Sequence, residues 1–270
     1  MPMNVIDYDR LDEWGPWVGE LISALGDDYL LVELARSQPE YIEDARDWLD
    51  ERLGRERVIQ TVAAGLCPYG VRLFHGTRLT DGELEQVRQH GLKPLNLADR
   101  ADRIAEILRL HTRWAEVEAR LPQAIVRFGP QARAGRREDG CVHACFSRSG
   151  LLLGCSHYLT YGAEVDGHIA HQLFGDASAG ALFRRERKPY LISFVVPFDD
   201  AARGSHSFGE LVAGQEIIVD KLVGAWAYWQ AHSEFQITTQ RSGWAAKFPG
   251  AIEPDRLTIE PVDDSGLEED

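Results

Sequence analysis

Apolar side chains recur at helical spacing over the first part of the chain. Trp17 and Leu21 fall on one side of an expected helix, and Pro39 stands where a second helix would begin. The Cys-Pro-Tyr-Gly sequence at 67–70 ends this pattern, since proline and glycine interrupt regular structure. We therefore expect residues 1–66 to form a helical N-terminal extension.

The centre of the chain combines short strands with helices. The apolar run at 71–77 predicts a strand. The next stretch begins with acidic residues and predicts a helix that ends at Gly91, because glycine is favoured just beyond helix C-termini. Three more elements are expected in order: a helix over 99–123, a strand over 141–147, and a helix over 154–177 that Gly162 interrupts and Gly175 ends.

The last third of the chain is rich in residues that favour strands. Strands are expected within 189–198 and 214–229 and, from weaker patterns, within 234–239 and 255–262. Because helices and strands segregate along the chain, the expected fold class is α+β and not a doubly wound parallel sheet. We expect one domain over 67–262, followed by an acidic disordered tail at 263–270.

Composition and charge narrow the possible functions. Of the 270 residues, 44% are hydrophobic and 27% are charged, an ordinary mixture for a globular protein with a core. The formal net charge of -14 disfavours non-specific binding to phosphate backbones. Two local basic clusters run against this trend, and we interpret them as solvated loops or helix ends: Arg133, Arg136 and Arg137, and Arg184, Arg185, Arg187 and Lys188.

The sequence carries no pattern for export or membrane insertion. Its first residues lack the basic and apolar regions of a secretory signal, and no run of about 18 apolar residues occurs. Four cysteines are too few for a disulfide framework. We expect a cytoplasmic protein with no membrane partner.

Common catalytic motifs are missing from the sequence, which contains no GxGxxG after a strand and no GxxxxGK[ST], GxSxG or HExxH. A zinc site can be drawn from Cys141, His143 and Cys145, with Cys155 and His157 close behind. However, alternate residues of a strand lie about 7 Å apart, which is wide for two ligands of one ion. Buried structural cysteines are the preferred interpretation, and no metal is expected.

Three stretches, in order, resemble the diphtheria-toxin-like and poly-ADP-ribose-polymerase-like ADP-ribosyltransferases. Residues 74–78 read Phe-His-Gly-Thr-Arg, and the helix after them ends in Gly-Leu-Lys-Pro at 91–94, similar to the family's NAD-binding strand and helix. Phe146-Ser147, followed by Tyr158 and Tyr161, is similar to the second motif. Residues 215–219, Gln-Glu-Ile-Ile-Val, are similar to the late strand that opens with glutamate.

The resemblance covers roughly residues 70 to 225 and departs from the family in two places. The expected helix over 99–123 and the Arg-rich loop after it would be an insertion. Arg148 stands where the family has a small hydroxyl residue, so the second motif is the least regular of the three.

The resemblance implies an α+β fold with a split antiparallel β-sheet, and NAD as the substrate that donates ADP-ribose. The catalytic residues that it implies are His75, Tyr161 and Glu216. The NAD-binding residues that it implies are His75, Gly76, Thr77, Ser147, Tyr158 and Tyr161.

These roles agree with elementary chemistry. A histidine nitrogen can bond a ribose hydroxyl, a glycine allows close approach to the nicotinamide amide, and a tyrosine face can stack on the ring. A fixed carboxylate stabilises the oxocarbenium-like ribose as nicotinamide leaves. Glu164 is a rival for this carboxylate; Glu216 is preferred because a strand would hold it more firmly.

The implied activity is transfer of ADP-ribose to a macromolecular acceptor, protein or nucleic acid, in a toxin or an antiphage-defence effector with a possible neutralising antitoxin partner. The sequence does not identify the acceptor, since Gln215 directly precedes Glu216 instead of standing two residues before it. Four alternatives stay open: an NAD glycohydrolase, a tRNA 2′-phosphotransferase-like enzyme, a non-catalytic NAD- or partner-binding module, and a zinc-stabilised interaction protein.

Overall fold

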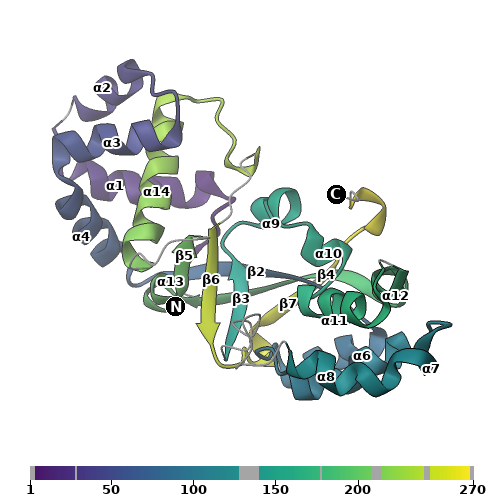
Figure 1. Cartoon of the computed structure of the whole chain (residues 1–270). Coiled ribbons are helices and arrows are strands. Elements are labelled where there is room, and N and C mark those ends of the chain that lie inside the picture. The colour runs from purple at the N-terminus through teal and green to yellow at the C-terminus, as the bar shows by residue number, and fades with distance from the viewer. Residues whose placement is uncertain are drawn as a thin grey trace. The chain divides into compact units, whose positions relative to one another are not determined.

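The computed structural model describes residues 4–27, 29–127, 140–176, 178–207, 214–239 and 244–267, and its fold is α+β (Figure 1). The chain divides into two compact units. Unit 1 comprises Met1–Leu73, Cys145–Gly154 and Val195–Ala246. Unit 2 comprises Phe74–Ala144, Cys155–Phe194 and Lys247–Asp270. The basic cluster at 133–137 lies outside the described residues.

One seven-stranded sheet runs in the order β5-β6-β3-β2-β4-β7, with β1 pairing β2 in addition. The β1–β2 pair is parallel, and the β4–β7 and β5–β6 pairs are antiparallel. The strands are β1 Val5–Ile6, β2 Gly70–Leu79, β3 Cys141–Cys145, β4 Lys188–Pro197, β5 Ser205–Ser207, β6 Trp244–Pro249 and β7 Leu257–Pro261. The predictions of strands at 71–77, 141–147, 189–198 and 255–262 are confirmed to within a few residues.

Unit 1 is built around one apolar helix, α14 (Gly214–Ala231), which packs against α1 (Leu11–Ser23), α2 (Leu30–Ser37), α3 (Ile42–Leu53) and α4 (Arg55–Leu66) (Figure 1). The prediction of a strand within 214–229 is therefore wrong. Neighbours on this helix that point in different directions, such as Ile217, Val219 and Ala225, are all buried. A helix covered on most sides reads as a continuous apolar run, which cannot be told from a buried strand by its period.

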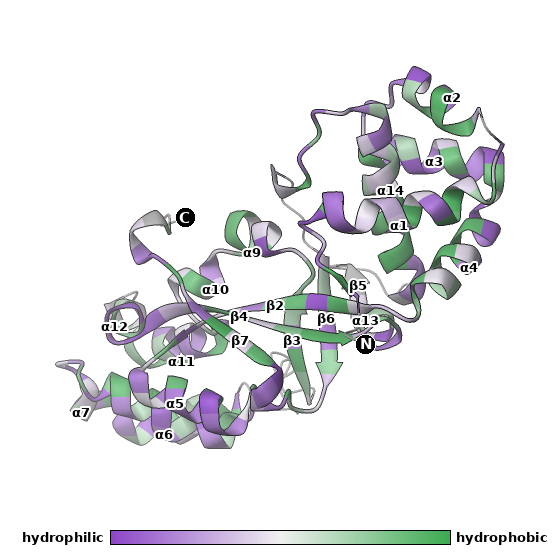
Figure 2. Cartoon of the chain, turned by 180° about the vertical axis from the view of Figure 1, so that it is seen from behind, coloured by the Kyte–Doolittle hydropathy of each residue, from purple (hydrophilic) through white to green (hydrophobic). Residues whose placement is uncertain are grey.

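The N-terminal helices share a core with α14 and are not an extension of their own. Figure 2 shows hydrophobic and hydrophilic residues on each of α1 and α3, as expected of helices with one covered face. The boundary expected at 66/67 accordingly differs from the division of the chain, which places residues 1–73 in unit 1 together with two later segments.

Aromatic side chains close the rest of unit 1. Trp244 stacks on Phe146 with ring centroids 3.7 Å apart, meets Tyr8 edge-on at 5.0 Å, and donates its indole N–H to Ser205 Oγ at 2.7 Å. These contacts hold the start of β6, a strand that the sequence pattern misses because its alanines give no alternation. The strand expected within 234–239 is wrong, since Ile237–Thr239 form a 3-10 turn.

In unit 2 the strand β2 leads directly into α5 (Asp81–His90). Thr80 Oγ1 accepts from the Glu83 N–H at 3.1 Å, and Glu83 Oε2 accepts from the Thr80 N–H at 2.9 Å, a reciprocal capping box. The helix ends at Gly91, which has a φ of +77°. Leu92 then pairs with Ile252 through two backbone hydrogen bonds of 2.9 and 2.8 Å.

The helix expected over 99–123 is several shorter helices. They are α6 (Leu97–Leu108), α7 (Trp114–Val117), a 3-10 turn (Glu118–Arg120) and α8 (Leu121–Val126). The His111 ring lies 4.1 Å from that of Phe174 and its Nδ1 accepts from the Arg113 N–H, which fixes a turn after α6. Pro122, in the first turn of α8, favours a fresh helix start.

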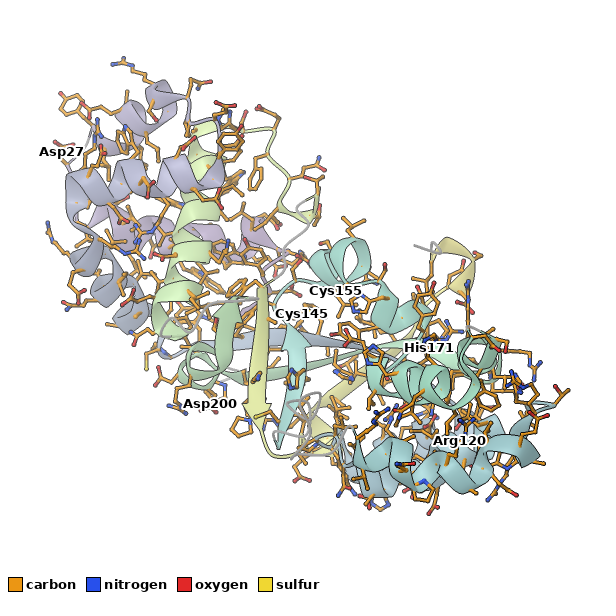
Figure 3. The ribbon with its side chains drawn as sticks, in the orientation of Figure 1. Asp27, Arg120, Cys145, Cys155, His171 and Asp200 are labelled. Atoms are coloured by element: carbon orange, nitrogen blue, oxygen red, sulfur yellow. The ribbon has the colours of Figure 1, made fainter. Side chains whose placement is uncertain are left out.

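Two later helices of unit 2, α11 (Glu164–Phe174) and α12 (Ser178–Glu186), gather with α6 and α8 around a second apolar core (Figure 1). They contribute Ile169, Leu173 and Phe183 to this core, and the short helix α10 (His157–Thr160) precedes α11. Gly162 and Gly175 have φ values of +80° and +75°, which confirms the predicted interruption and end of the helix over 154–177. Arg120, labelled in Figure 3, ties the 3-10 turn to α11 through the Leu173 carbonyl at 2.5 Å.

We predict that Gly91 and Gly175 respond very differently to alanine. A Cβ at Gly91 would lie 2.0 Å from the Ile252 carbonyl oxygen, whereas one at Gly175 meets nothing within 4 Å. Gly175→Ala should lower the free energy of unfolding by about 1 kcal/mol, from backbone strain alone. Gly91→Ala should lower it by at least about 3 kcal/mol. Urea unfolding of both variants checks this, and equal losses would contradict the Leu92–Ile252 pairing.

Candidate functional site

His75 lies on β2, and its hydrogen bond fixes which ring nitrogen carries the proton. Nδ1 lies 2.7 Å from the His143 carbonyl oxygen. A carbonyl only accepts, so Nδ1–H is the donor in the neutral ring and Nε2 keeps a free lone pair. Burial of the ring is the largest influence on the His75 pKa and lowers it, which favours the neutral form. His75 therefore offers one acceptor nitrogen.

Gly76 and Thr77 continue β2 and are both buried. Successive side chains of a strand point to opposite faces, so Thr77 shares a face with His75, and Arg78 lies on the other. The strand thus places the His75 and Thr77 side chains on one face of the sheet.

The segment from α10 to the start of α11 carries Tyr158, Tyr161 and the rival carboxylate of Glu164. Tyr158 lies on α10 with its ring centroid 4.1 Å from that of His157, and Tyr161 follows the helix with 42% of its surface exposed. Glu164 opens α11, and its Oε1 lies 3.3 Å from His157 Nε2. Gly162 makes the turn that brings Glu164 back to α10.

Glu216 does not open a strand. It stands in the first turn of α14 in unit 1, where its carboxylate lies 3.9 Å from Arg55 Nη2. Asp220, one turn later, is also paired with Arg55 and with Arg46. The strand that would favour Glu216 over Glu164 as the carboxylate is therefore absent, because residues 214–231 form a helix.

Ser147 caps a helix in unit 1. Its Oγ accepts from the Gly150 N–H at 2.7 Å and donates to Asp9 Oδ1 at 2.6 Å, while Asp9 Oδ2 accepts from the Ser149 N–H at 2.8 Å. These bonds satisfy the start of α9 (Arg148–Gly154). Asp9 gave no signal in the sequence, because its partners lie 138 and 140 residues away.

A buried network of four charges lies in unit 2. Arg187 donates to Glu83 through two bonds of 2.9 and 2.8 Å and to Asp166 at 2.5 Å. Arg100 donates to the same Asp166 at 2.5 and 2.7 Å. Asp166 is fully buried, and its two arginines outweigh the effect of burial and lower its pKa. The network ties α5, α6, α11 and the chain before β4 together.

One further trio carries the residue types of a hydrolase triad. His111 Nε2 lies 2.9 Å from Ser178 Oγ, which is bonded to Asp176. Because His111 Nδ1 accepts from the Arg113 N–H at 3.1 Å, Nε2 bears the proton in the neutral ring and donates to the serine. Such a histidine cannot take the serine proton, so the trio stabilises the start of α12 and is no nucleophile.

The residues expected at the site divide between the two units. His75, Gly76, Thr77, Tyr158 and Tyr161 belong to unit 2, and so does Glu164. Ser147 and Glu216 belong to unit 1. Unit 2 by itself therefore contains a histidine, two tyrosines and a carboxylate of the expected site.

Neither a metal centre nor a membrane-spanning helix is found among the described residues. No group of three or more His, Cys, Asp or Glu in that part of the chain is arranged to hold a metal ion. No helix there is both long and apolar enough to cross a bilayer.

Comparison with protein-family models, with curated proteins and with solved structures found no match.

We predict that Asp166→Asn is strongly destabilising. The change is isosteric but leaves the arginines of the network without one of their two buried carboxylates, which should cost about 3–5 kcal/mol. Asp81→Asn is the matched control, because Asp81 pairs with Lys188 at 3.0 Å where both side chains are exposed. This control should lose less than about 1 kcal/mol. Urea unfolding compares the two, and similar losses would contradict a buried network.

We also predict that His75 titrates below its ordinary pKa of 6.5 in the folded protein. Because the folded pKa is lowered, the His75 contribution to the free energy of unfolding should be constant above pH 6.5 and fall as the pH drops toward the folded pKa. NMR of the imidazole protons, assigned by their loss in His75→Gln, measures the midpoint. A midpoint at or above 6.5 would show that the ring is not held neutral.

Proposed function

We propose that the protein is an NAD-dependent ADP-ribosyltransferase whose site lies in unit 2. The observation that supports the proposal is the tautomer of His75. Its Nδ1–H donates to the His143 carbonyl, so Nε2 is a hydrogen-bond acceptor suited to a ribose hydroxyl of NAD. The finer fold assignment, an ADP-ribosyltransferase-like sheet, belongs to the same proposal.

Around His75 the other roles follow from residue chemistry. The Gly76 backbone pairs with the nicotinamide amide, and the half-exposed ring of Tyr161, or that of Tyr158, stacks on the nicotinamide. The bond between nicotinamide and ribose breaks with its electron pair leaving on nicotinamide. The acceptor's nucleophilic atom then bonds the ribose C1′ and releases its proton.

Glu164 is the carboxylate that we assign to this reaction. It belongs to the same unit as His75 and follows Tyr161 by three residues. It lies in the first turn of α11. A carboxylate at this position stabilises the positive charge that develops on the ribose.

The acceptor is a macromolecule, protein or nucleic acid, and the proposed setting is a cytoplasmic toxin or antiphage effector with a neutralising partner. Net charge of -14 favours a protein acceptor over an extended nucleic-acid surface. Water as the acceptor would make the protein an NAD glycohydrolase with the same site.

The test is NAD turnover by wild type, Glu164→Gln and Glu216→Gln, with nicotinamide release and transfer of labelled ADP-ribose to a cell lysate both measured. The two variants are matched, since each removes one charge from the first turn of a helix. We expect Glu164→Gln to lose roughly 100-fold or more in turnover, the scale of one lost electrostatic contact in a transition state. Glu216→Gln should stay near wild type.

The outcomes separate the alternatives. Loss of activity in Glu216→Gln alone would restore the glutamate that the sequence favours. Nicotinamide release without labelling would indicate the glycohydrolase. Absence of NAD binding by the wild type would refute the proposed function, and His75 would be a core histidine.

A further inference from the structure

Arg78 is a buried cation at the end of β2. Its side chain is only 1% exposed, and the β2 alternation puts it on the face opposite His75. Both terminal nitrogens are used, while Nε is buried and has no hydrogen-bond partner among the described residues. A guanidinium in this position needs a counter-charge, because an unpaired buried charge is strongly destabilising.

Most partners of Arg78 are backbone carbonyls at the ends of helices. Nη1 donates to Leu159 O at 2.8 Å, and Nη2 donates to Arg184 O and Arg187 O, both at 2.7 Å. Leu159 lies in α10, Arg184 in α12, and Arg187 just before β4. These carbonyls belong to packed elements and are fixed hydrogen-bond acceptors, but they carry no net negative charge.

The counter-charge of Arg78 is the partly exposed carboxylate of Asp264. Arg78 donates two hydrogen bonds to it, from Nη1 to Oδ1 and from Nη2 to Oδ2, each at 2.8 Å. The Asp264 side chain is 46% exposed, and the residue lies on a single 3-10 turn, Asp264–Gly266. The contact with Arg78 lowers the Asp264 pKa, and the charge of Arg184 adds to this effect. The disordered tail expected from 263 onward is thus wrong for 263–267, and 268–270 lie outside the described residues.

The three carbonyl ligands of Arg78 and its carboxylate ligand Asp264 differ in how easily they can be displaced. The carbonyls belong to packed helices and to the chain before β4, whereas Asp264 lies on a short turn that is partly exposed to water. A guanidinium fork binds carboxylate and phosphate groups with the same two-bond geometry. Any oxyanion that displaces Asp264 would restore the charge balance that Arg78 requires.

We propose that Arg78 forms the floor of a small oxyanion-binding site and that Asp264 occupies it as a displaceable internal ligand. The ligand class is a carboxylate or phosphate group that enters from the solvent side of Asp264. Its chemistry does not depend on NAD, and Arg78 and His75 face opposite sides of β2. The two proposed sites adjoin at α10, because the Leu159 carbonyl that Arg78 bonds lies next to Tyr158.

The test removes the internal ligand and supplies an external one. Asp264→Ala leaves Arg78 without a counter-ion, so its melting temperature should fall below that of wild type. Formate or inorganic phosphate should then raise it saturably, by about 3 °C or more, as expected for binding to the folded state alone. Wild type should show the same saturable rise only at higher anion concentration, because the anion must displace Asp264. A wild type that shows no rise at any concentration would contradict displacement.

Two controls and a second test variant keep the result specific. Sodium chloride at matched ionic strength measures general salt effects. Asp81→Ala removes an exposed carboxylate from an exposed lysine and should gain nothing specific from formate or phosphate. If Asp264→Ala does not fold, Asp264→Asn is titrated in the same way, because its neutral amide is a weaker ligand that an anion can displace.

The two anions distinguish the source of the ligand. A response to formate assigns a carboxylate site, and a response to phosphate alone assigns a phosphate site. If the Asp264 variants respond to neither anion beyond the chloride control, no site opens, and Asp264 is a permanent structural counter-ion of Arg78.

Discussion

Burial of charge in unit 2 is the constraint on which the proposed site depends. Arg187 is held between Glu83 and Asp166, and Arg100 completes the group. Each charge is tolerable only while its partners stay in place, because an unpaired ion in the core costs several kcal/mol, on the order of the whole stability of many domains. α5 begins directly after the strand that carries His75, and α11 begins with Glu164. The network therefore fixes the two elements that flank the proposed chemistry.

The same unit contains a second buried guanidinium whose circumstances are different. The carboxylates that hold Arg187 are buried with it, so that pair is closed to ligands. The carboxylate that holds Arg78 is nearly half exposed and lies on a short turn near the chain end. Both contacts are two-bond ion pairs of similar length. Exposure of the acid, and not the strength of the contact, is what makes one of them a possible binding site.

Glu216 shows how a fold changes the meaning of a motif. In the sequence, Gln-Glu-Ile-Ile-Val reads as the start of an apolar strand with a carboxylate at its tip. In the structure these residues open the helix that the other helices of unit 1 surround. The apolar run is the same in both cases, since burial on most sides removes the period that separates a helix from a strand. The carboxylate consequently lies at the start of a helix beside Arg55 and not at the tip of a strand.

Local chemistry let the sequence by itself determine much of unit 2. The capping box at Thr80, the glycine ends at Gly91 and Gly175, and the break at Gly162 each depend on residues within a few positions of one another, and the structure contains them all. The α+β class followed from the segregation of helical and extended patterns. Contacts between distant residues were decided only by the tertiary structure: Asp9 with Ser147, Arg78 with Asp264, and the helices that enclose α14. Such contacts leave no periodic trace in the sequence, because they are selected by packing and charge balance between segments more than a hundred residues apart.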